Sequence, residues 1–260
     1  MLWGWKENGG GGSDPQEELF LLLDEGLRLP RRWKATLLIL IPKDPKEVGE
    51  YRLISLCTTL YKIVTKILAN RLKNVLHYLI SDEQGALVPG RQISENIMLA
   101  QEIVHSLKQA PASQALMLVK ADMEKAYDRM SWSFLEAVLT HYGLPRQWIQ
   151  WAMACITGPS FSVMVNGTLA GSFESKTGLR QGCPLSPYLF ILGADVLSRL
   201  LHRAAEARLL QGLPMPTGKP PLTHLLFADL TAHCLRMQLK VTARHCVNAC
   251  WSTASNRAYG

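Results

Sequence analysis

Segments typical of strands and segments typical of helices alternate irregularly along this chain, which excludes a sheet built from repeating βαβ units. The apolar run in "WKATLLILIPK", residues 33–43, predicts a buried strand. Apolar residues at helical spacing predict long helices over 59–80 and 186–209. Asn166-Gly167 predicts a hairpin, because this dipeptide favours the tight turn between antiparallel strands. We therefore expect an α+β fold, and with 48% apolar residues in 260 the chain can form a substantial core.

Shorter helices are expected where a cap or a proline marks the end of an apolar pattern. A helix over 94–108 is expected to have Ser94 as its N-cap. A helix over 131–143 has a serine at its start and Gly143 at its end. A further short helix is expected over 17–30, where a proline stops the pattern.

Basic residues are concentrated in one part of the chain. The formal net charge is +7, and the segment 28–73 alone contains eleven Lys and Arg residues against three Asp and Glu residues. Such a block favours a polyanionic partner, of which nucleic acid is the commonest. A solvated surface kept soluble by these charges is the alternative that remains open.

The cysteines and the apolar runs limit the remaining classes of protein. The six cysteines are scattered without C-x-x-C spacing, which favours free thiols of an intracellular protein over a disulfide framework. A zinc site of His245, Cys246 and Cys250 is a weak alternative, because no second ligand pair has matching spacing. The longest apolar run, residues 35–41, is too short to cross a bilayer, so no membrane partner is expected.

Two apolar segments of strand type each end in an aspartate. Asp122 follows "LMLVKA", and Asp229 follows "THLLFA". Either aspartate alone could be a turn former. If the two strands pair, both carboxylates emerge at one edge of a sheet and can bind Mg²⁺ for phosphoryl transfer.

Three motifs near these aspartates occur in a recognisable order. "DMEKAYDRMSW" at 122–132, "GLRQGCPLSPYLF" at 178–190 and "FAD" at 227–229 together resemble the palm motifs of reverse transcriptases. The resemblance is to the enzymes of non-LTR (LINE-type) retrotransposons, particularly plant-like ones, and it covers roughly residues 17–230. It implies the polymerase right-hand fold with fingers and palm, and we expect the thumb to be missing.

The resemblance also suggests a division of the chain into four parts. We expect a disordered leader over 1–15, fingers with the fingers–palm connection over 16–110, palm over 111–235, and a degenerate tail over 236–260.

The family pattern implies roles for residues at the reacting centre. Asp122 and Asp229 would bind Mg²⁺ or Mn²⁺, with the backbone carbonyl of Met123 as a further ligand. Tyr127 matches the aromatic residue that rejects a ribose 2′-hydroxyl by bulk, and a core tyrosine is the alternative. Two further residues match the motif that contacts the incoming nucleotide, where glycine permits close approach of the backbone: Gln181 and Gly182.

Basic residues are expected to bind phosphate groups. Lys43 and Arg52 match residues of the fingers that pair with the triphosphate. Four residues are expected to bind the template backbone, with plain surface charge as the alternative for each: Lys62, Lys66, Arg71 and Arg91.

One departure from the family pattern bears directly on activity. Leu230 stands where the family has a second aspartate. Either leucine replaced that aspartate, or one aspartate was lost and the following strand slipped by one residue, which exchanges its faces. A missing carboxylate lowers the rate by roughly 10²- to 10⁴-fold. Leu53 and Gly85 also depart from the usual residues.

We therefore expect an RNA-directed DNA polymerase domain that is weak or inactive, with an RNA template, a DNA primer and dNTPs as partners. A non-catalytic nucleic-acid-binding remnant of a retroelement is the main alternative. An intron-maturase-like protein is a lesser one, because no maturase-specific segment follows the palm motifs. Access to genomic DNA would require the nucleus, but "RLPRRWK" is too short a basic segment to assign a compartment.

Overall fold

The structure is a computed structural model, and it describes residues 29–41, 51–111, 116–123, 125–213, 221–227 and 230–236. Within these ranges the side chains of Arg52, Leu116, Asp122 and residues 230–236 are not described. The expected leader, the expected helix before Pro30 and nearly all of the expected tail lie outside the described residues.

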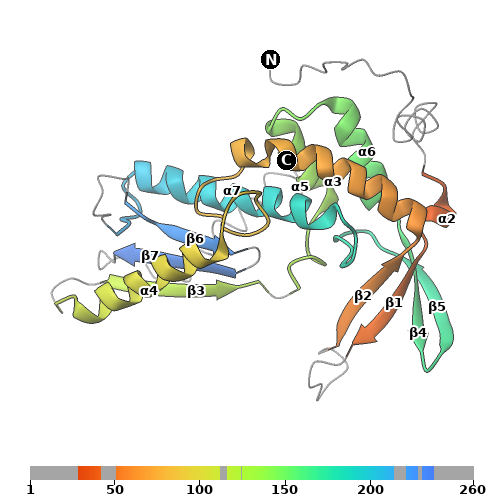
Figure 1. Ribbon diagram of the computed structural model, residues 1–260, viewed down its shortest axis with the longest axis horizontal. Helices are drawn as coiled ribbons and strands as arrows, with labels where there is room; N and C mark the ends of the chain where they lie inside the picture. Colours follow the sequence, from red (N-terminus) through yellow and green to blue (C-terminus); the bar gives the residue numbers. More distant parts are fainter. Residues whose placement is uncertain are drawn as a thin grey trace.

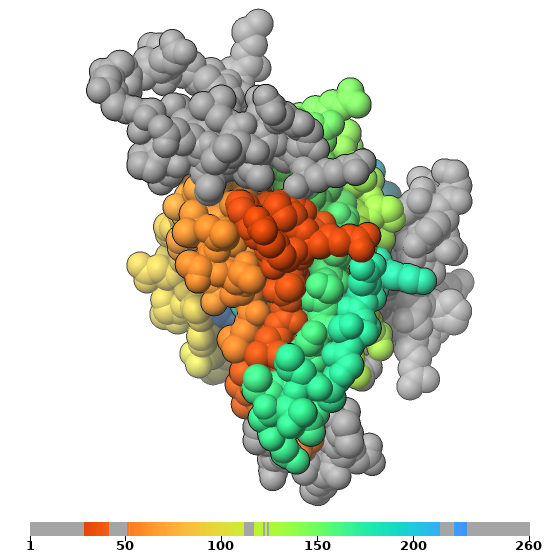
Figure 2. All heavy atoms as spheres, turned by 90° about the vertical axis from the view of Figure 1, so that its right-hand side faces the viewer, coloured from red at the N-terminus to blue at the C-terminus, as the bar shows by residue number. Residues whose placement is uncertain are grey.

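One sheet contains four strands in the order β2-β1-β4-β5 (Figure 1). The predicted strand over 33–43 is confirmed as β1 (Thr36–Ile41), which pairs antiparallel with β2 (Arg52–Cys57). It is not the fully buried strand that we expected, because only Thr36 and Leu38 are buried and Ile41 is exposed. On its other side β1 pairs parallel with β4 (Ser160–Val165), which in turn pairs antiparallel with β5 (Thr168–Glu174). In the space-filling view, β1 accordingly lies between the region of β2 and the β4–β5 hairpin (Figure 2).

The hairpin between β4 and β5 is confirmed at the predicted dipeptide. Asn166 and Gly167 have φ angles of 49° and 78°, and Val165 pairs with Thr168 across the two-residue turn. Positive φ at both turn residues matches the right-handed twist of the flanking strands. Through this hairpin, a segment that we expected in the palm adds two strands to the sheet of β1 and β2.

The second sheet contains three strands in the order β3-β7-β6. Its central strand is β7 (Leu230–Arg236), which is antiparallel to both β3 (Leu116–Asp122) and β6 (His224–Phe227). The outer strands β3 and β6 therefore run in the same direction, and their carboxyl ends meet at one edge of the sheet.

A loop extends this sheet beyond β6. The Leu226 N–H donates to the carbonyl of Glu83 at 2.9 Å, and the Gly85 N–H donates to the carbonyl of Leu226 at 3.0 Å. Gln84 and Leu226 form a parallel bridge. Residues 83–85 thus pair with backbone groups that an edge strand would otherwise leave open.

Six helices surround the sheets in the described part of the chain. They are α2 (Arg31–Lys34), α3 (Thr59–Leu79), α4 (Ile93–Gln109), α5 (Trp132–His141), α6 (Arg146–Ile156) and α7 (Ser186–Glu206).

The main hydrophobic core lies among α3, α5, α6 and α7 (Figure 1). Its fully buried large side chains include Tyr61, Leu68, Leu72, Leu135, Leu139, Leu189 and Phe190. A smaller cluster lies where α4 packs against the second sheet, around Ile103 and Leu225. His224, which precedes Leu225 in β6, lies instead against α7, where it hydrogen-bonds to Ser198. Because successive side chains of a strand point to opposite faces, α4 and α7 cover opposite faces of this sheet.

Two helix predictions have different outcomes at their caps. Ser131 is confirmed as the N-cap of α5, because its hydroxyl accepts from the Phe134 N–H at 3.4 Å. The prediction of Ser94 as a cap is wrong. The N-cap of α4 is Gln92, and the Ser94 hydroxyl lies 3.4 Å from the Gln92 side-chain oxygen. The cap lies two residues earlier than the local serine signal indicated.

The described helices include none that is long and apolar enough to span a membrane.

The first sheet is joined to the helices through the loop before α7. Arg180 in this loop is 5% exposed, and its guanidinium donates to the Cys155 carbonyl at 2.5 Å and to the Lys34 carbonyl at 3.2 Å. It also donates to the Thr36 hydroxyl at 3.1 Å and lies 3.9 Å from the centroid of the Tyr61 ring. Burial first, and the nearby Arg180 charge second, lower the pKa of Lys34.

The next two residues of this loop contact β2. The Ser55 N–H donates to the Gln181 carbonyl at 2.9 Å. Gly182 has a φ of +111°, and a Cβ atom there would lie 2.6 Å from the Ser55 carbonyl oxygen. Glycine is therefore required at this position both for its backbone conformation and for the close approach of β2.

Substitution of Gly182 by alanine should displace the loop from β2. We expect Gly182→Ala to lower the free energy of unfolding by at least about 2 kcal/mol, measured by urea denaturation. Gly171→Ala is the matched control: Gly171 also has a positive φ, of +63°, but a Cβ there meets no atom within 4 Å. That control should cost about 1 kcal/mol. Equal losses in the two variants would show that contact with Ser55 does not constrain the loop.

Candidate functional site

The carboxyl end of β3 and the amino end of β7 lie directly opposite each other. Asp122 is the Cα partner of Leu230, and Leu230 is also the Cα partner of Phe227 at the end of β6. The strands that lead to the two predicted catalytic aspartates therefore do not pair with each other, because β7 lies between them. Their ends nevertheless reach the same edge of the sheet.

Asp229 itself lies outside the described residues. It directly precedes Leu230 in the sequence. The backbone register thus brings the second predicted aspartate within one residue of the position opposite Asp122.

The segment after β3 holds Tyr127 against the helical core. The ring of Tyr127 stacks on Phe190 of α7, with centroids 4.9 Å apart and planes 10° apart. The carbonyl of Tyr127 accepts from the Leu179 N–H at 2.8 Å. The side chain is half-buried, so one part of the ring packs in the core and another part reaches the surface. Met123, next to Asp122, also packs against this core.

The loop that carries Gln181 and Gly182 is bonded to the same segment. The Gly178 N–H donates to the Met130 carbonyl at 2.9 Å, and the Trp132 indole N–H donates to the Gly178 carbonyl at 2.7 Å. Gln181 is half-buried and Gly182 is exposed. The structure therefore brings the loop, Tyr127 and the end of β3 into one connected region, which also contacts β2 through Ser55.

The predicted phosphate-binding residues are only partly described. Lys43 lies outside the described residues. Arg52 begins β2, where its backbone pairs with Ile41 and its side chain is not described. Lys62 and Lys66 are exposed on α3, and Arg71 on the same helix is half-buried.

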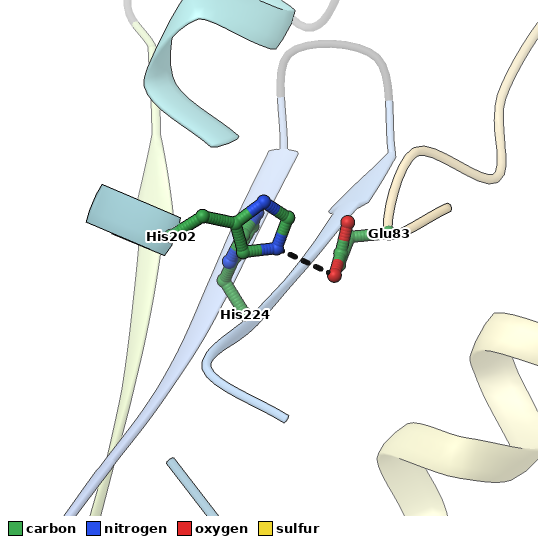
Figure 3. A group of neighbouring side chains, drawn as sticks. All are labelled: Glu83, His202 and His224. Atoms are coloured by element: carbon green, nitrogen blue, oxygen red, sulfur yellow. Dashed lines mark hydrogen bonds and ion pairs between the residues drawn. The ribbon is translucent and has the colours of Figure 1, made fainter. Parts of the chain in front are cut away.

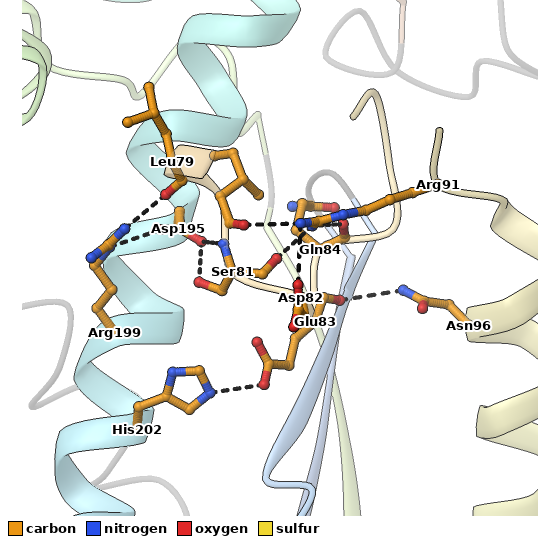
Figure 4. A network of polar contacts seen from close by, with 11 residues as sticks. Leu79, Ser81, Asp82, Glu83, Gln84, Arg91, Asn96, Asp195, Arg199 and His202 are labelled. Atoms are coloured by element: carbon orange, nitrogen blue, oxygen red, sulfur yellow. Dashed lines mark hydrogen bonds and ion pairs between the residues drawn. The ribbon is translucent and has the colours of Figure 1, made fainter. Parts of the chain in front are cut away.

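Arg91 has a role inside the chain that the sequence pattern did not predict (Figure 4). Its guanidinium donates to the carbonyls of Ser81, Gln84 and Ile80 at 2.6, 2.8 and 3.0 Å. It also contacts the Asp82 carboxylate at 3.4 Å, and its side chain is only 19% exposed. Because these donors are used by the loop that follows α3, Arg91 shapes this loop and we leave it out of the proposed template contacts.

Two functional features escaped prediction from the sequence. Arg180, which is buried where the first sheet meets the helices, lies within a recognised motif but was not singled out. A group of three side chains, Glu83, His202 and His224, comes together from three separate segments. Only the fold brings these three together, so no local pattern indicates them.

Comparison with known proteins agrees with the geometry of the palm-like sheet. Residues 41–255 match the family described as "Reverse transcriptase (RNA-dependent DNA polymerase)". The chain is 33% identical over 177 residues to the 149 kDa protein of transposon TX1 from Xenopus laevis, which covers 67% of this chain and 13% of that protein. It is 27% identical over 183 residues to the Pol polyprotein of the type-2 retrotransposable element R2DM from Drosophila melanogaster, which covers 69% of this chain and 17% of that protein. The chain thus spans less than a fifth of the length of these curated relatives.

Solved structures of telomerase share the fold. The telomerase of Candida tropicalis in complex with a fragment of telomeric RNA superposes with a TM-score of 0.54 and 14% identity, over 90% of this chain and 40% of that one. At this identity the likeness concerns the fold alone, and it confirms the predicted α+β architecture of fingers and palm. Together with the relatives from transposable elements, it leads to one conclusion: this chain belongs to the reverse transcriptase (RNA-dependent DNA polymerase) family, in the branch of LINE-type retrotransposons.

Proposed function

We propose that this chain is an RNA-directed DNA polymerase domain, with its reacting centre at the edge of the sheet β3-β7-β6. The reaction is attack of a primer 3′-hydroxyl on the α-phosphate of a dNTP, with pyrophosphate as the leaving group. The observation that carries this proposal is the backbone register, in which Asp122 lies opposite the residue that follows Asp229.

The donors at this edge fit a magnesium site. Asp122 and Asp229 supply carboxylates, and Met123 supplies a backbone carbonyl. Mg²⁺ in phosphoryl-transfer sites takes one or two carboxylates and fills its remaining positions with water and substrate phosphate. A bound Mg²⁺ or Mn²⁺ would neutralise the charge that develops on the transferred phosphate.

The region beside this edge is suited to positioning a nucleotide. Stacking on Phe190 fixes the Tyr127 ring, and a fixed ring can reject a ribose 2′-hydroxyl by bulk. Gln181 and Gly182 are held against Ser55 of β2, so the nucleotide loop and the fingers sheet are positioned together. Arg52 lies three residues before Ser55 on the same strand, about 10 Å along it, and it is proposed to bind the triphosphate. Lys43 is proposed for the same role.

The template would follow the exposed basic side of α3. Lys62 and Lys66 are exposed and one helical turn apart, so both can contact a phosphate backbone. Arg71 is the third proposed contact on this helix.

Leu230 makes this polymerase weak or inactive. It stands directly opposite Asp122, at the first residue of the central strand. A leucine offers no metal ligand there, so the two carboxylates that remain must hold the metal ions alone.

A single substitution should therefore restore activity. In Mg²⁺-dependent primer extension on poly(rA)/oligo(dT), we expect Leu230→Asp to exceed the parent chain by roughly 10²- to 10⁴-fold. Thr231→Asp is the matched control, since it adds the same charge one residue further along β7, opposite Ala121. It should restore nothing. A variant with Asp inserted after Asp229 tests the loss of a residue instead, because it shifts all of β7 by one position.

The role of Asp122 has its own test in the restored background. Asp122→Ala combined with Leu230→Asp should abolish extension, because the double variant lacks one of the metal-binding carboxylates. Continued extension by this double variant would refute the assignment of Asp122. If neither repaired chain extends primer although circular dichroism shows both folded, this sheet edge is not the reacting centre.

A second candidate function is non-catalytic binding of RNA, which the leucine at position 230 and the exposed Lys62 and Lys66 favour. On this proposal Lys62→Ala with Lys66→Ala weakens RNA binding, and the slope of log K against log salt falls by about 0.7 for each phosphate that is no longer neutralised. Lys108→Ala, which removes one charge at an exposed site on α4, should leave the slope unchanged. Binding that the double substitution does not weaken contradicts a template path along α3.

A further inference from the structure

A group of metal-ligating side chains lies away from the catalytic edge. Glu83 follows α3, His202 is on α7, and His224 begins β6 (Figure 3). One ligand atom from each lies within 4.8 Å of the other two. His224 is three residues before Phe227, so the group lies about 10 Å along the sheet from the edge that bears Asp122.

The carboxylate of Glu83 is only partly satisfied. Its Oε1 atom lies 2.8 Å from Nε2 of His202. Its Oε2 atom is buried and has no hydrogen-bond partner within the described parts of the chain. A buried carboxylate oxygen without a partner carries a large desolvation cost, which a bound cation would remove.

Hydrogen bonds outside the group hold His224 in place, whereas His202 bonds to Glu83. His224 is fully buried, with Nε2 at 2.6 Å from the Ser198 hydroxyl and Nδ1 at 2.7 Å from the Thr223 hydroxyl. Whichever ring nitrogen binds a metal, the other keeps a hydroxyl partner that orients the ring, as metal-binding histidines require. His202 is 41% exposed and can adjust its rotamer. Its ring centroid lies 5.4 Å from that of His224.

We propose that Glu83, His202 and His224 form a site for Zn²⁺, distinct from the magnesium site of nucleotidyl transfer. Two imidazoles and one carboxylate suit Zn²⁺ and not Mg²⁺, which prefers oxygen ligands throughout. Tetrahedral zinc brings its ligand atoms to roughly 3.4 Å from one another, so no pair of ligand atoms need close by more than about 1.4 Å. Water completes the fourth position.

The site joins the three segments that position β6. Glu83 also accepts, through its backbone carbonyl, from the Leu226 N–H and from the Asn96 side chain at 3.3 Å (Figure 4). A metal bound here therefore ties the loop 83–85 to α7 and to β6, the strand that leads to Asp229. Its effect is on the stability of this end of the palm sheet, because the group touches no proposed substrate contact.

The test is zinc binding by the whole chain after removal of metal by a chelator. We expect one Zn²⁺ per chain at this site by titration, and a Co²⁺ adduct with the visible absorption of tetrahedral coordination. His202→Ala and Glu83→Gln should each lower the affinity at least roughly 100-fold and remove the Co²⁺ absorption. Zn²⁺ should raise the melting temperature of the parent chain and not that of either variant. Excess Mg²⁺ should not compete.

The control is His105→Ala, which removes an exposed histidine of α4 and should keep the affinity of the parent. Every variant retains the histidines and cysteines beyond residue 227, so any binding by those residues would persist in His202→Ala and Glu83→Gln. Affinity that is equal in all four chains, or absent from the parent, overturns the proposal. Since the readout is binding, the result is independent of whether the chain extends a primer.

Discussion

The buried side chain of Arg180 is the interaction on which the packing of the first sheet against the helices depends. A charged group that is 5% exposed is stable only if its donors are satisfied, and here the acceptors come from α2, β1 and α6, with the Tyr61 ring of α3 against its face. These segments must therefore converge on one residue. The next two residues of the same loop, Gln181 and Gly182, contact Ser55 of β2. The residue that joins the first sheet to the helices therefore belongs to the proposed nucleotide loop.

The second sheet is organised by the same requirement for satisfied polar groups. Loop 83–85 pairs with the outer side of β6, and Arg91 and Asn96 bind carbonyls on either side of that pairing. Below this loop the buried Asp195 accepts from the Ser81 N–H at 2.8 Å and from the Tyr142 hydroxyl at 2.6 Å. Burial and the Asp195 charge accordingly raise the pKa of Tyr142. The loop is thus held from both sides, and its position sets that of the strand leading to Asp229.

Local patterns predicted the elements that local forces determine. The strand β1, the helix α3, the cap at Ser131 and the turn at Asn166-Gly167 were all predictable, since each rests on neighbours in sequence. Helix α6 was missed, although apolar residues at helical spacing and the preceding proline indicate it. Features that rest on distant partners could not be predicted in this way. The sequence suggested that Arg91 is a surface cation, yet its guanidinium donates to three carbonyls of the loop after α3. Nor did the sequence indicate that β7 lies between β3 and β6, the strands that lead to Asp122 and Asp229.

The central place of β7 has a consequence for the newly made chain. All four strands of the first sheet lie before residue 175, whereas β7 leaves the ribosome after both of the strands that it joins. Until β7 is made, β3 and β6 lack the strand that pairs with both of them. Completing the sheet requires pairing between residues that are far apart in the sequence, such as Leu116 and Arg236. Unpaired strand edges invite pairing with other chains. The sheet that bears Asp122 is therefore the last of the two to be completed as the chain is made, and its strand edges stay open to pairing the longest.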